Sequence, residues 1–259
     1  LPVGLLWSYL TSLPLSVHAD IIKRRKEKPL HFTLLDPGKM GADELVELAT
    51  QTAYAGTDGF MVGGSTDLSL EKVDSAVDAI KEITHLPVIL FPTHASSVSG
   101  RADAIFFMSL LNSESRQFLV GEQIASARWV QQTGLEPLSM AYLVIAPGMA
   151  AGRVGQAQPL PRDDSDLVVS HALAGQYLGM KYIYLEAGSG ALEPVPDAII
   201  SAVKNATEVI LIVGGGIRTP QAASKAVAAG ADIIVTGTLV ETSDRLKEDI
   251  SLLIKSIHS

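Results

Sequence analysis

The sequence predicts a single (β/α)8 barrel, an α/β fold of the TIM type, formed by residues 30–259. Eight short apolar runs rich in β-branched residues recur along the chain, and stretches with helical spacing separate most of them. Continuous apolar runs are typical of strands buried on both faces of a parallel sheet. An open, doubly wound sheet is the alternative that this pattern leaves. The expected strands are 31–36, 59–63, 87–92, 104–111, 140–148, 182–188, 209–216 and 233–238.

Helices are expected between these strands, with one exception. Apolar residues recur every three or four positions over 45–52, 70–80 and 246–257, which is the spacing of one helical face. Residues 93–103 (THASSVSGRAD) separate the third and fourth strands, and they are too few and too rich in Ser and Gly for a covering helix. The third helix of the barrel is therefore predicted to be missing, which leaves a gap in the outer wall.

Residues 1–29 form a leading segment before the predicted barrel. Its first 19 residues are apolar enough to resemble part of a signal peptide, but no positive charge precedes them and Pro2 and Pro14 interrupt them. The segment is also too short and broken for a membrane span. We expect a leading helix that covers the bottom of the barrel or an oligomer surface, and a secretion signal is the alternative.

Composition excludes several classes of function. The net charge is −8, and the one basic run is KRRKEK at Lys23–Lys28, so nothing resembles a surface that follows nucleic-acid phosphates. The absence of cysteine removes disulfides, thiol catalysis and thiolate metal sites. We expect a cytoplasmic protein with no nucleic-acid partner and at most peripheral membrane contact. Trp129 and the apolar leading segment favour buried contacts between subunits of a homo-oligomer.

Glycine-rich stretches follow the last three strands. They are YLEAGSG (184–190), VGGGIRTP (213–220) and VTGT (235–238). In TIM barrels the chemistry lies at the carboxyl ends of the strands, and the loops after strands seven and eight commonly bind phosphate through backbone N–H groups. We therefore expect a phosphate there, although a single glycine at a strand end more often makes a tight turn.

Glu186 lies beside this predicted phosphate site and would repel an anion. A carboxylate accepts hydrogen bonds from hydroxyl groups. The combination predicts a small polyol phosphate as ligand, with its phosphate among the glycines and its hydroxyls on Glu186 and Tyr184. A structural ion pair at a strand end is the alternative for Glu186.

Two oxygen donors follow the first two strands. Asp36 lies in LLDPGK and Ser65 in VGGST, and hard oxygen ligands suit Mg2+ that shares its shell with water and phosphates. One carboxylate makes a poor site alone, so this assignment makes sense for a ligand with its own diphosphate. The alternative is that Asp36 caps a turn before Pro37.

Seven motifs, in order and at the expected strands, carry a resemblance to a known family. They are HFTLLDPGK, VGGST, DAIFFMSLLNS, AYLVIAPG, YLEAGSG, VGGGIR and VTGT. Together, from about Leu30 to Glu241, the chain resembles the geranylgeranylglyceryl phosphate synthases and relatives that use other prenyl chains. Members of that family have a barrel without the third helix, which agrees with the gap expected here.

The resemblance implies a Mg2+-dependent prenyltransferase. The 3-hydroxyl of sn-glycerol 1-phosphate would attack C1 of a polyprenyl diphosphate, geranylgeranyl diphosphate above all, and form the first ether bond of archaeal-type lipids. Asp36 and Ser65 would bind the metal, and Asp36 and Glu186 would be the catalytic residues. The implied substrate-binding residues are Tyr184, Leu185, Glu186, Ala187, Gly188, Ser189, Gly190, Gly214, Gly215, Gly216, Gly237 and Thr238. Many relatives have Asn where this chain has Thr238.

Elementary chemistry supports these roles. Glu186 would orient and deprotonate the attacking hydroxyl as general base. Lys39 could place a cation near the diphosphate, although a solvated lysine is an equal alternative. The prenyl tail needs an apolar groove, and the candidates beside the missing helix are Phe91, Phe107, Met108 and Phe118, which could also be plain core residues. The resemblance suggests dimers or hexamers.

Two other classes of function remain as alternatives. Isomerases and lyases of phosphorylated sugars carry a similar phosphate loop, but they need an acid–base pair at strands one and five. Strand one offers Asp36, whereas the fifth predicted strand ends in IAPG without a titratable group. A catalytically idle scaffold would have no reason to hold Asp36, Ser65 and Glu186 at three separate strand ends.

Overall fold

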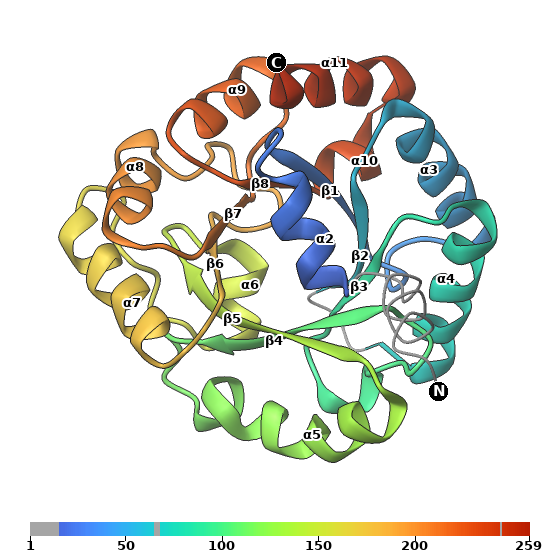
Figure 1. Cartoon of the computed structure of the whole chain (residues 1–259), viewed down its shortest axis with the longest axis horizontal. Coiled ribbons are helices and arrows are strands. Elements are labelled where there is room, and N and C mark those ends of the chain that lie inside the picture. Colours follow the sequence, from blue (N-terminus) through green and yellow to red (C-terminus); the bar gives the residue numbers. More distant parts are fainter. Residues whose placement is uncertain (1–15, 65–67, 244) are drawn as a thin grey trace, which may run out of the picture.

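The chain forms a closed barrel of eight parallel strands, as the sequence predicts (Figure 1). The computed structural model describes residues 16–64, 68–243 and 245–259. Each strand pairs with its neighbours along the chain, and β1 pairs with β8, where Leu30 lies opposite Ile233. The strands are β1 (Leu30–Leu35), β2 (Gly59–Gly63), β3 (Val88–Phe91), β4 (Ala104–Leu110), β5 (Glu136–Val144), β6 (Tyr182–Glu186), β7 (Ile210–Gly214) and β8 (Ile233–Thr236).

The helices surround the barrel except at the predicted gap. Between β3 and β4 the chain makes only a 3-10 turn, Ala95–Ser97, so the missing third helix is confirmed. No helix in the described part of the chain is long and apolar enough to cross a membrane. The α-helices are α2 (Val17–Arg24), α3 (Ala42–Ala55), α4 (Leu70–Ile83), α5 (Glu122–Thr133), α6 (Met149–Val154), α7 (Ser165–Tyr177), α8 (Asp197–Ala206), α9 (Pro220–Ala228), α10 (Thr238–Thr242) and α11 (Leu246–His258).

The predicted helical faces pack as expected, with differences at their edges. Leu45, Val73 and Ile250 are buried in α3, α4 and α11. Leu48 is half-buried, and Leu70 is exposed because it is the first residue of α4. Two residues define the start of α9. The side chain of Thr219 accepts a hydrogen bond from the N–H of Ala222 at 3.2 Å, and Pro220 occupies the first helical position, which suits proline.

The fifth strand begins and ends four residues earlier than predicted. It runs from Glu136 to Val144 and pairs with all of β4, from Ala104 opposite Glu136 to Leu110 opposite Tyr142. Glu and Pro have low strand propensity, which hides this start in the sequence, but pairing with a seven-residue neighbour outweighs that preference. The IAPG sequence therefore lies beyond β5, and the inward-facing side chains near the strand's end are Tyr142 and Val144.

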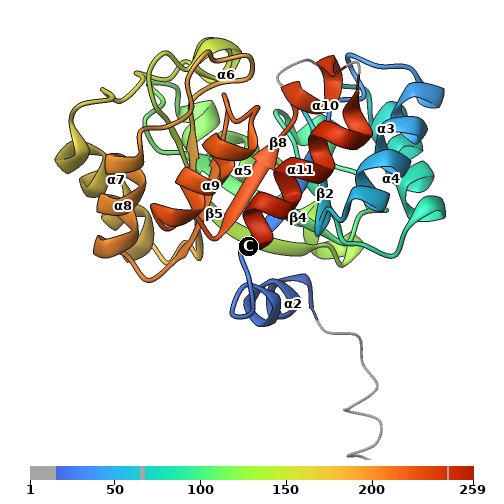
Figure 2. The ribbon, with the colours of Figure 1, turned by 90° about the horizontal axis from the view of Figure 1, so that it is seen from above.

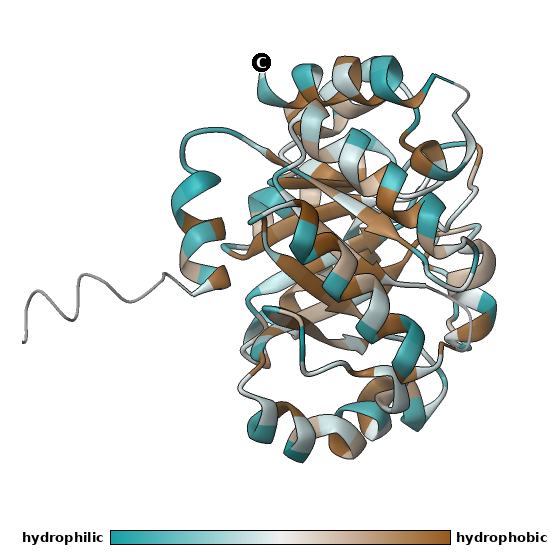
Figure 3. Ribbon diagram, turned by 90° about the vertical axis from the view of Figure 1, so that its right-hand side faces the viewer, coloured by the Kyte–Doolittle hydropathy of each residue, from teal (hydrophilic) through white to brown (hydrophobic). Residues whose placement is uncertain are grey.

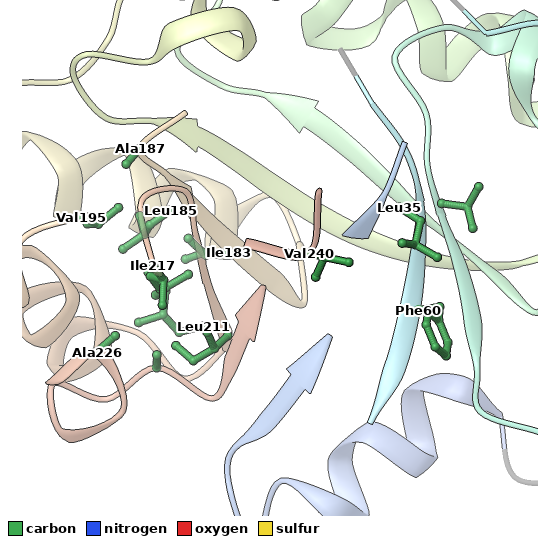
Figure 4. Close-up of a cluster of buried hydrophobic side chains, with 14 of the residues drawn as sticks. Leu35, Phe60, Ile183, Leu185, Ala187, Val195, Leu211, Ile217, Ala226 and Val240 are labelled. Carbon is green, nitrogen blue, oxygen red and sulfur yellow. The ribbon is translucent and has the colours of Figure 1, made fainter. Parts of the chain in front are cut away.

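Alternation along the strands divides the core into two layers. Side chains that point into the barrel form one cluster with Phe32, Met61, Phe106, Tyr182 and Tyr184 among its members. Side chains that point outward pack under the helices, as Figure 4 shows for Leu35, Phe60, Ile183, Leu185 and Leu211. The strands are accordingly apolar along their length, while the helices carry polar residues outward (Figure 3).

Helix α2 lies across the bottom of the barrel (Figure 2), as predicted for part of the leading segment. Ile21 is 1% exposed and packs in the inner cluster. The Glu136 carboxylate accepts the N–H groups of Val17 at 2.6 Å and His18 at 3.1 Å, and His18 Nδ1 lies 2.7 Å from the Tyr182 hydroxyl. The first 15 residues lie outside the described part of the chain.

The buried carboxylate of Asp58 connects α2 and α11 to the bottom of the barrel. Asp58, whose side chain is 3% exposed, accepts hydrogen bonds from His258 Nε2 at 2.8 Å and from the His31 N–H at 2.9 Å, and it pairs with Arg24 and Lys28. Burial alone would raise the pKa of the Asp58 carboxyl, but these hydrogen bonds and the charges of His258 and Arg24 lower it to about 2.

Asp58→Asn is expected to lower the free energy of unfolding at pH 7 by about 2 kcal/mol or more, because Arg24, Lys28 and His258 lose the buried negative charge that pairs with them. Folding lowers this pKa from 3.8 to about 2, so the stabilisation is complete above the unfolded value and is lost as the pH falls through the folded one. Urea denaturation should show a gap between wild type and variant that narrows below pH 4. Exposed Asp163→Asn is the control, and an equal loss there would contradict the assignment.

Candidate active site

Two adjoining cavities open at the carboxyl ends of the strands. The larger encloses about 1120 Å3, its open mouth included, and extends from Asp36 on the β1 side across β3 and β4. The smaller encloses about 370 Å3 over the loops after β6, β7 and β8. Glu186 and Ser189 line both of them. The carboxylate therefore lies where a compact ligand in the smaller cavity would meet a long one in the larger.

Glu186 is 6% exposed and is held by three donors from two strands and a loop. Its Oε1 accepts the N–H of Gly188 at 2.6 Å, and the hydroxyls of Tyr142 and Tyr184 also hydrogen-bond to the carboxylate. Burial disfavours the charged form, and although the three hydrogen bonds favour it, the pKa of Glu186 remains above its ordinary value. A carboxylate in this state is a better proton acceptor than an exposed one.

Tyr142 and Tyr184 lie opposite each other on β5 and β6 and form an aromatic cluster with Phe91. The Phe91 ring stacks on Tyr184 at 5.5 Å and meets Tyr142 edge-on at 5.5 Å, and the two tyrosine rings are 5.3 Å apart. Burial, together with the charge of Glu186, raises the pKa of both phenols well above the usual value. Both hydroxyls therefore stay protonated and act as donors.

The glycines after β7 make room for this arrangement. A Cβ on Gly214 would overlap the Tyr184 hydroxyl, and one on Gly215 would overlap Glu186 Oε1. Gly216 would place its Cβ 2.6 Å from the backbone of Glu193. Gly215 and Gly216 also have φ of 80° and 73°, a region that side chains disfavour. The GGG sequence is thus required by the close packing of Tyr184, Glu186 and the Glu193 backbone against this turn.

The smaller cavity has the parts of an anion site. Ser189, Gly215, Gly216 and Thr238 line it, and Thr238 Oγ1 accepts the N–H of Gly190 at 3.2 Å, which ties two of its loops together. Arg218 also lines it, and in the described part of the chain its buried Nε has no hydrogen-bond partner. Arg218 is not among the substrate-binding residues predicted from the sequence, although it lies two residues after the glycines of VGGGIR.

Asp36 and Lys39 lie at the other end of the larger cavity. The Asp36 side chain is 3% exposed, its Oδ1 accepts the N–H of Gly38 at 3.0 Å, and its Oδ2 lies 3.6 Å from Lys39 Nζ. Lys39 also pairs with Glu241 at 3.2 Å, so it is neither fully solvated nor dedicated to Asp36. A Cβ on Gly64 would overlap the Asp36 carboxylate. The turn-capping alternative for Asp36 is thus observed, and the carboxylate still faces the cavity.

Apolar side chains form the wall of the larger cavity beside the missing helix. Phe91, Phe107, Met108 and Phe118 all line it, and all four are partly exposed. They are not plain core residues, because a sealed core would leave no accessible surface at these positions. The gap in the helical wall and the apolar lining coincide, as the sequence predicts.

Comparison with known proteins adds the family. A model of the PcrB family matches residues 19–256, nearly the whole described chain. The chain belongs to the PcrB family. Its relatives include the geranylgeranylglyceryl phosphate synthases of Thermococcus gammatolerans, 52% identical over 232 residues (90% of this chain, 92% of the relative), and Thermoplasma volcanium, 45% identical over 245 residues (95% and 97%).

A solved structure resembles this PcrB-family chain over nearly its full length. It is the crystal structure of (S)-3-O-geranylgeranylglyceryl phosphate synthase from Thermoplasma acidophilum in complex with sn-glycerol-1-phosphate. The TM-score is 0.92 at 45% identity, covering 95% of this chain and 99% of the other. A thiamine phosphate pyrophosphorylase from Pyrococcus furiosus, with a TM-score of 0.56 and 11% identity, shares the fold alone.

Five of the predicted substrate-binding residues line neither cavity of this PcrB-family chain: Leu185, Ala187, Gly188, Gly190 and Gly214. The side chains of Leu185 and Ala187 point outward into the layer under the helices (Figure 4), because they alternate with the inward-facing Tyr184 and Glu186. Gly190 contributes its N–H to Thr238. The other seven line a cavity: Tyr184, Glu186, Ser189, Gly215, Gly216, Gly237 and Thr238.

The donor set near Asp36 fits Mg2+ in one way only. Ser65, the second predicted metal ligand, lies outside the described residues. Among residues 16–64, 68–243 and 245–259 no group of three or more His, Cys, Asp or Glu side chains could hold a metal ion. Mg2+ keeps several waters and commonly binds through one or two carboxylates plus substrate phosphates. Asp36 suits an ion that arrives with a diphosphate, and it does not suit an ion bound by protein alone.

Proposed function

We propose that this protein is a prenyltransferase that joins a prenyl diphosphate, specifically geranylgeranyl diphosphate, to the 3-hydroxyl of sn-glycerol 1-phosphate. The observation that carries the proposal is the position of Glu186, which lines both a small polar cavity and a long apolar one. The names of the relatives and the sn-glycerol-1-phosphate of the Thermoplasma acidophilum complex support the two substrates.

In this proposal the smaller cavity binds the glycerol phosphate. Backbone N–H groups around Gly215, Gly216 and Ser189 suit the phosphate oxygens, and the Arg218 guanidinium on the same cavity offsets the charge that Glu186 adds. The hydroxyl end then points to Glu186 at the junction. The affinity for the polyol and the affinity for the phosphate thus depend on different residues.

The reaction needs a proton acceptor and a route for the leaving group. The 3-hydroxyl oxygen of the glycerol forms a bond to C1 of the prenyl chain while the bond from C1 to the diphosphate oxygen breaks, and the diphosphate leaves with that electron pair. The hydroxyl proton passes to Glu186, whose raised pKa suits a general base. The partly exposed apolar wall that includes Phe91 and Phe118 holds the prenyl tail away from water.

Asp36 would hold the diphosphate end, with Mg2+ as the cofactor and Ser65 as a second ligand. When bound, the ion would neutralise the charge that develops on the leaving diphosphate. Lys39 adds a protein cation beside Asp36, at 3.6 Å. A cytoplasmic homo-oligomer, a dimer or hexamer, completes the proposal, and sedimentation at working concentration tests it, since a monomer there would contradict it.

The decisive experiment supplies the purified protein with labelled prenyl diphosphates and either enantiomer of glycerol phosphate. We expect an ether product with sn-glycerol 1-phosphate and much less with its mirror image. The isomerase alternative is disfavoured because Tyr142, the titratable side chain near the carboxyl end of β5, has a pKa raised well above the usual value. No prenyl transfer with any donor would overturn the proposal.

A further inference from the structure

Tyr142 is the residue of the site for which neither the motifs nor the proposed function provides a role. It comes from β5, it is buried, and its hydroxyl hydrogen-bonds to Glu186. Its ring is fixed by edge-on contacts with Phe91 at 5.5 Å and Tyr184 at 5.3 Å. A side chain held on two sides by rings has little freedom to turn its hydroxyl away from the carboxylate.

The two tyrosines that bind Glu186 face different cavities. Tyr184 lines the smaller one, with the glycines and Arg218, whereas Tyr142 lines the larger one, with Phe91 and Phe118. The carboxylate is therefore held from the polyol side by one phenol and from the prenyl side by the other.

The hydrogen bonds to Glu186 leave little of its carboxylate free for substrate. An ionised carboxylate has about four lone-pair positions. The Gly188 N–H, the Tyr142 hydroxyl and the Tyr184 hydroxyl occupy three. About one remains for a substrate hydroxyl, so the attacking oxygen is directed to a single position.

We propose that Tyr142 is a positioning residue for this reaction: its hydroxyl fixes the Glu186 carboxylate from the prenyl side, so that only the polyol hydroxyl reaches it. The inference rests on the proposed function. In this inference Tyr142 orients the general base, and it also keeps water away from the lone pair of the Glu186 carboxylate that faces the larger cavity. Water bound there would attack C1 of the prenyl chain, giving a prenyl alcohol and free diphosphate in place of the ether.

Few charged groups compete with Tyr142 for influence over Glu186. The groups that act on its proton affinity are the two phenols and the Gly188 N–H. The other titratable groups are farther along the cavities: Asp36, Lys39, His94, Glu122 and Glu241 line the larger cavity with it, and Arg218 lines the smaller. Loss of the Tyr142 donor removes support for the charged form while leaving these groups in place.

The test is Tyr142→Phe, which keeps the ring and removes the donor. Tyr182→Phe is the matched control, because Tyr182 is another buried tyrosine of the barrel interior whose hydroxyl meets His18 at the bottom of the barrel. The protonated Glu186 carboxyl is followed by difference infrared spectroscopy against pH, with its band assigned by its absence in Glu186→Gln. In parallel, kcat/KM is measured against pH, and the ratio of prenyl alcohol to ether is measured for each variant.

We expect the infrared midpoint and the acidic limb of kcat/KM to move to higher pH by about one unit in Tyr142→Phe. The alcohol-to-ether ratio should rise severalfold, while KM for the prenyl diphosphate stays within about threefold. Tyr182→Phe should move neither limb nor ratio. If Tyr142→Phe does not fold, Tyr142→Leu replaces it in the same measurements.

The outcomes separate the inference from the proposed function. An infrared midpoint in Tyr142→Phe that matches the control overturns the role of Tyr142, whatever the activity. An unchanged alcohol-to-ether ratio overturns the exclusion of water. If the wild-type protein transfers no prenyl group, the proposed function is wrong. The infrared midpoint then still decides whether Tyr142 holds Glu186.

Discussion

Glu186→Gln is expected to lower kcat by roughly a hundredfold or more, because the variant keeps the shape of the side chain and loses its basicity. The structure sharpens the reason. Three donors converge on the carboxylate: the Gly188 N–H and the hydroxyls of Tyr142 and Tyr184. An amide offers one oxygen and two N–H donors of its own, so at least one of these donors must lose its acceptor. The measurement is turnover with saturating prenyl diphosphate and sn-glycerol 1-phosphate.

Calorimetric titration separates the chemistry from binding. Inorganic phosphate should bind Glu186→Gln as well as wild type or slightly better, because a nearby negative charge is gone. Gly215→Ala is the contrasting variant. Its Cβ would overlap Glu186 Oε1 at a φ of 80°, so it should weaken phosphate and glycerol phosphate together and also reduce turnover. If Glu186→Gln abolishes phosphate binding, the carboxylate holds the loop together and does not recognise the polyol.

The fold could be predicted from the sequence because its signals are local. Apolar runs identify the strands that are buried on both faces. The stretch 93–103 is too short and too polar to form a covering helix, so the missing third helix could also be predicted. The predicted position of the fifth strand was wrong by four residues, because the start of this strand depends on pairing with β4. Ala104 and Glu136 pair although they are 32 positions apart in the sequence, and the residues around Pro137 show no pattern that predicts a strand.

The place of a residue at the cavities could be predicted only where a single motif indicates both its position at a strand end and its chemical role. Glu186 and the glycines at 215 and 216 meet that condition, since strand, turn and charge lie within a few residues. Tyr142 does not, because its role appears only when β5 and β6 lie side by side and bring it opposite Tyr184. Leu185 and Ala187 show what inclusion of a whole motif overlooks, since alternation along the strand turns every second side chain outward.

Asp36→Asn is the second change with a large expected effect. The variant keeps the size of the side chain and its place beside Gly64, and it loses the charge that attracts a hard cation. Turnover should fall by roughly a hundredfold or more, because the leaving diphosphate would no longer be neutralised, and raised Mg2+ should restore part of it. Affinity for glycerol phosphate should stay near normal, because Asp36 does not line the smaller cavity.

A matched variant decides whether the loss comes from the metal or from Lys39. Asp36→Asn also removes a partner of the Lys39 ammonium, at 3.6 Å, and Glu241 is the other carboxylate paired with that ammonium. Glu241→Gln therefore changes the charge around Lys39 without touching Asp36. We expect it to cost only a few-fold in turnover, with an unchanged dependence on Mg2+, since exposed pairs contribute little. Equal losses in the two variants would assign the effect to Lys39, and an Asp36→Asn enzyme that works at ordinary Mg2+ would remove the metal assignment altogether.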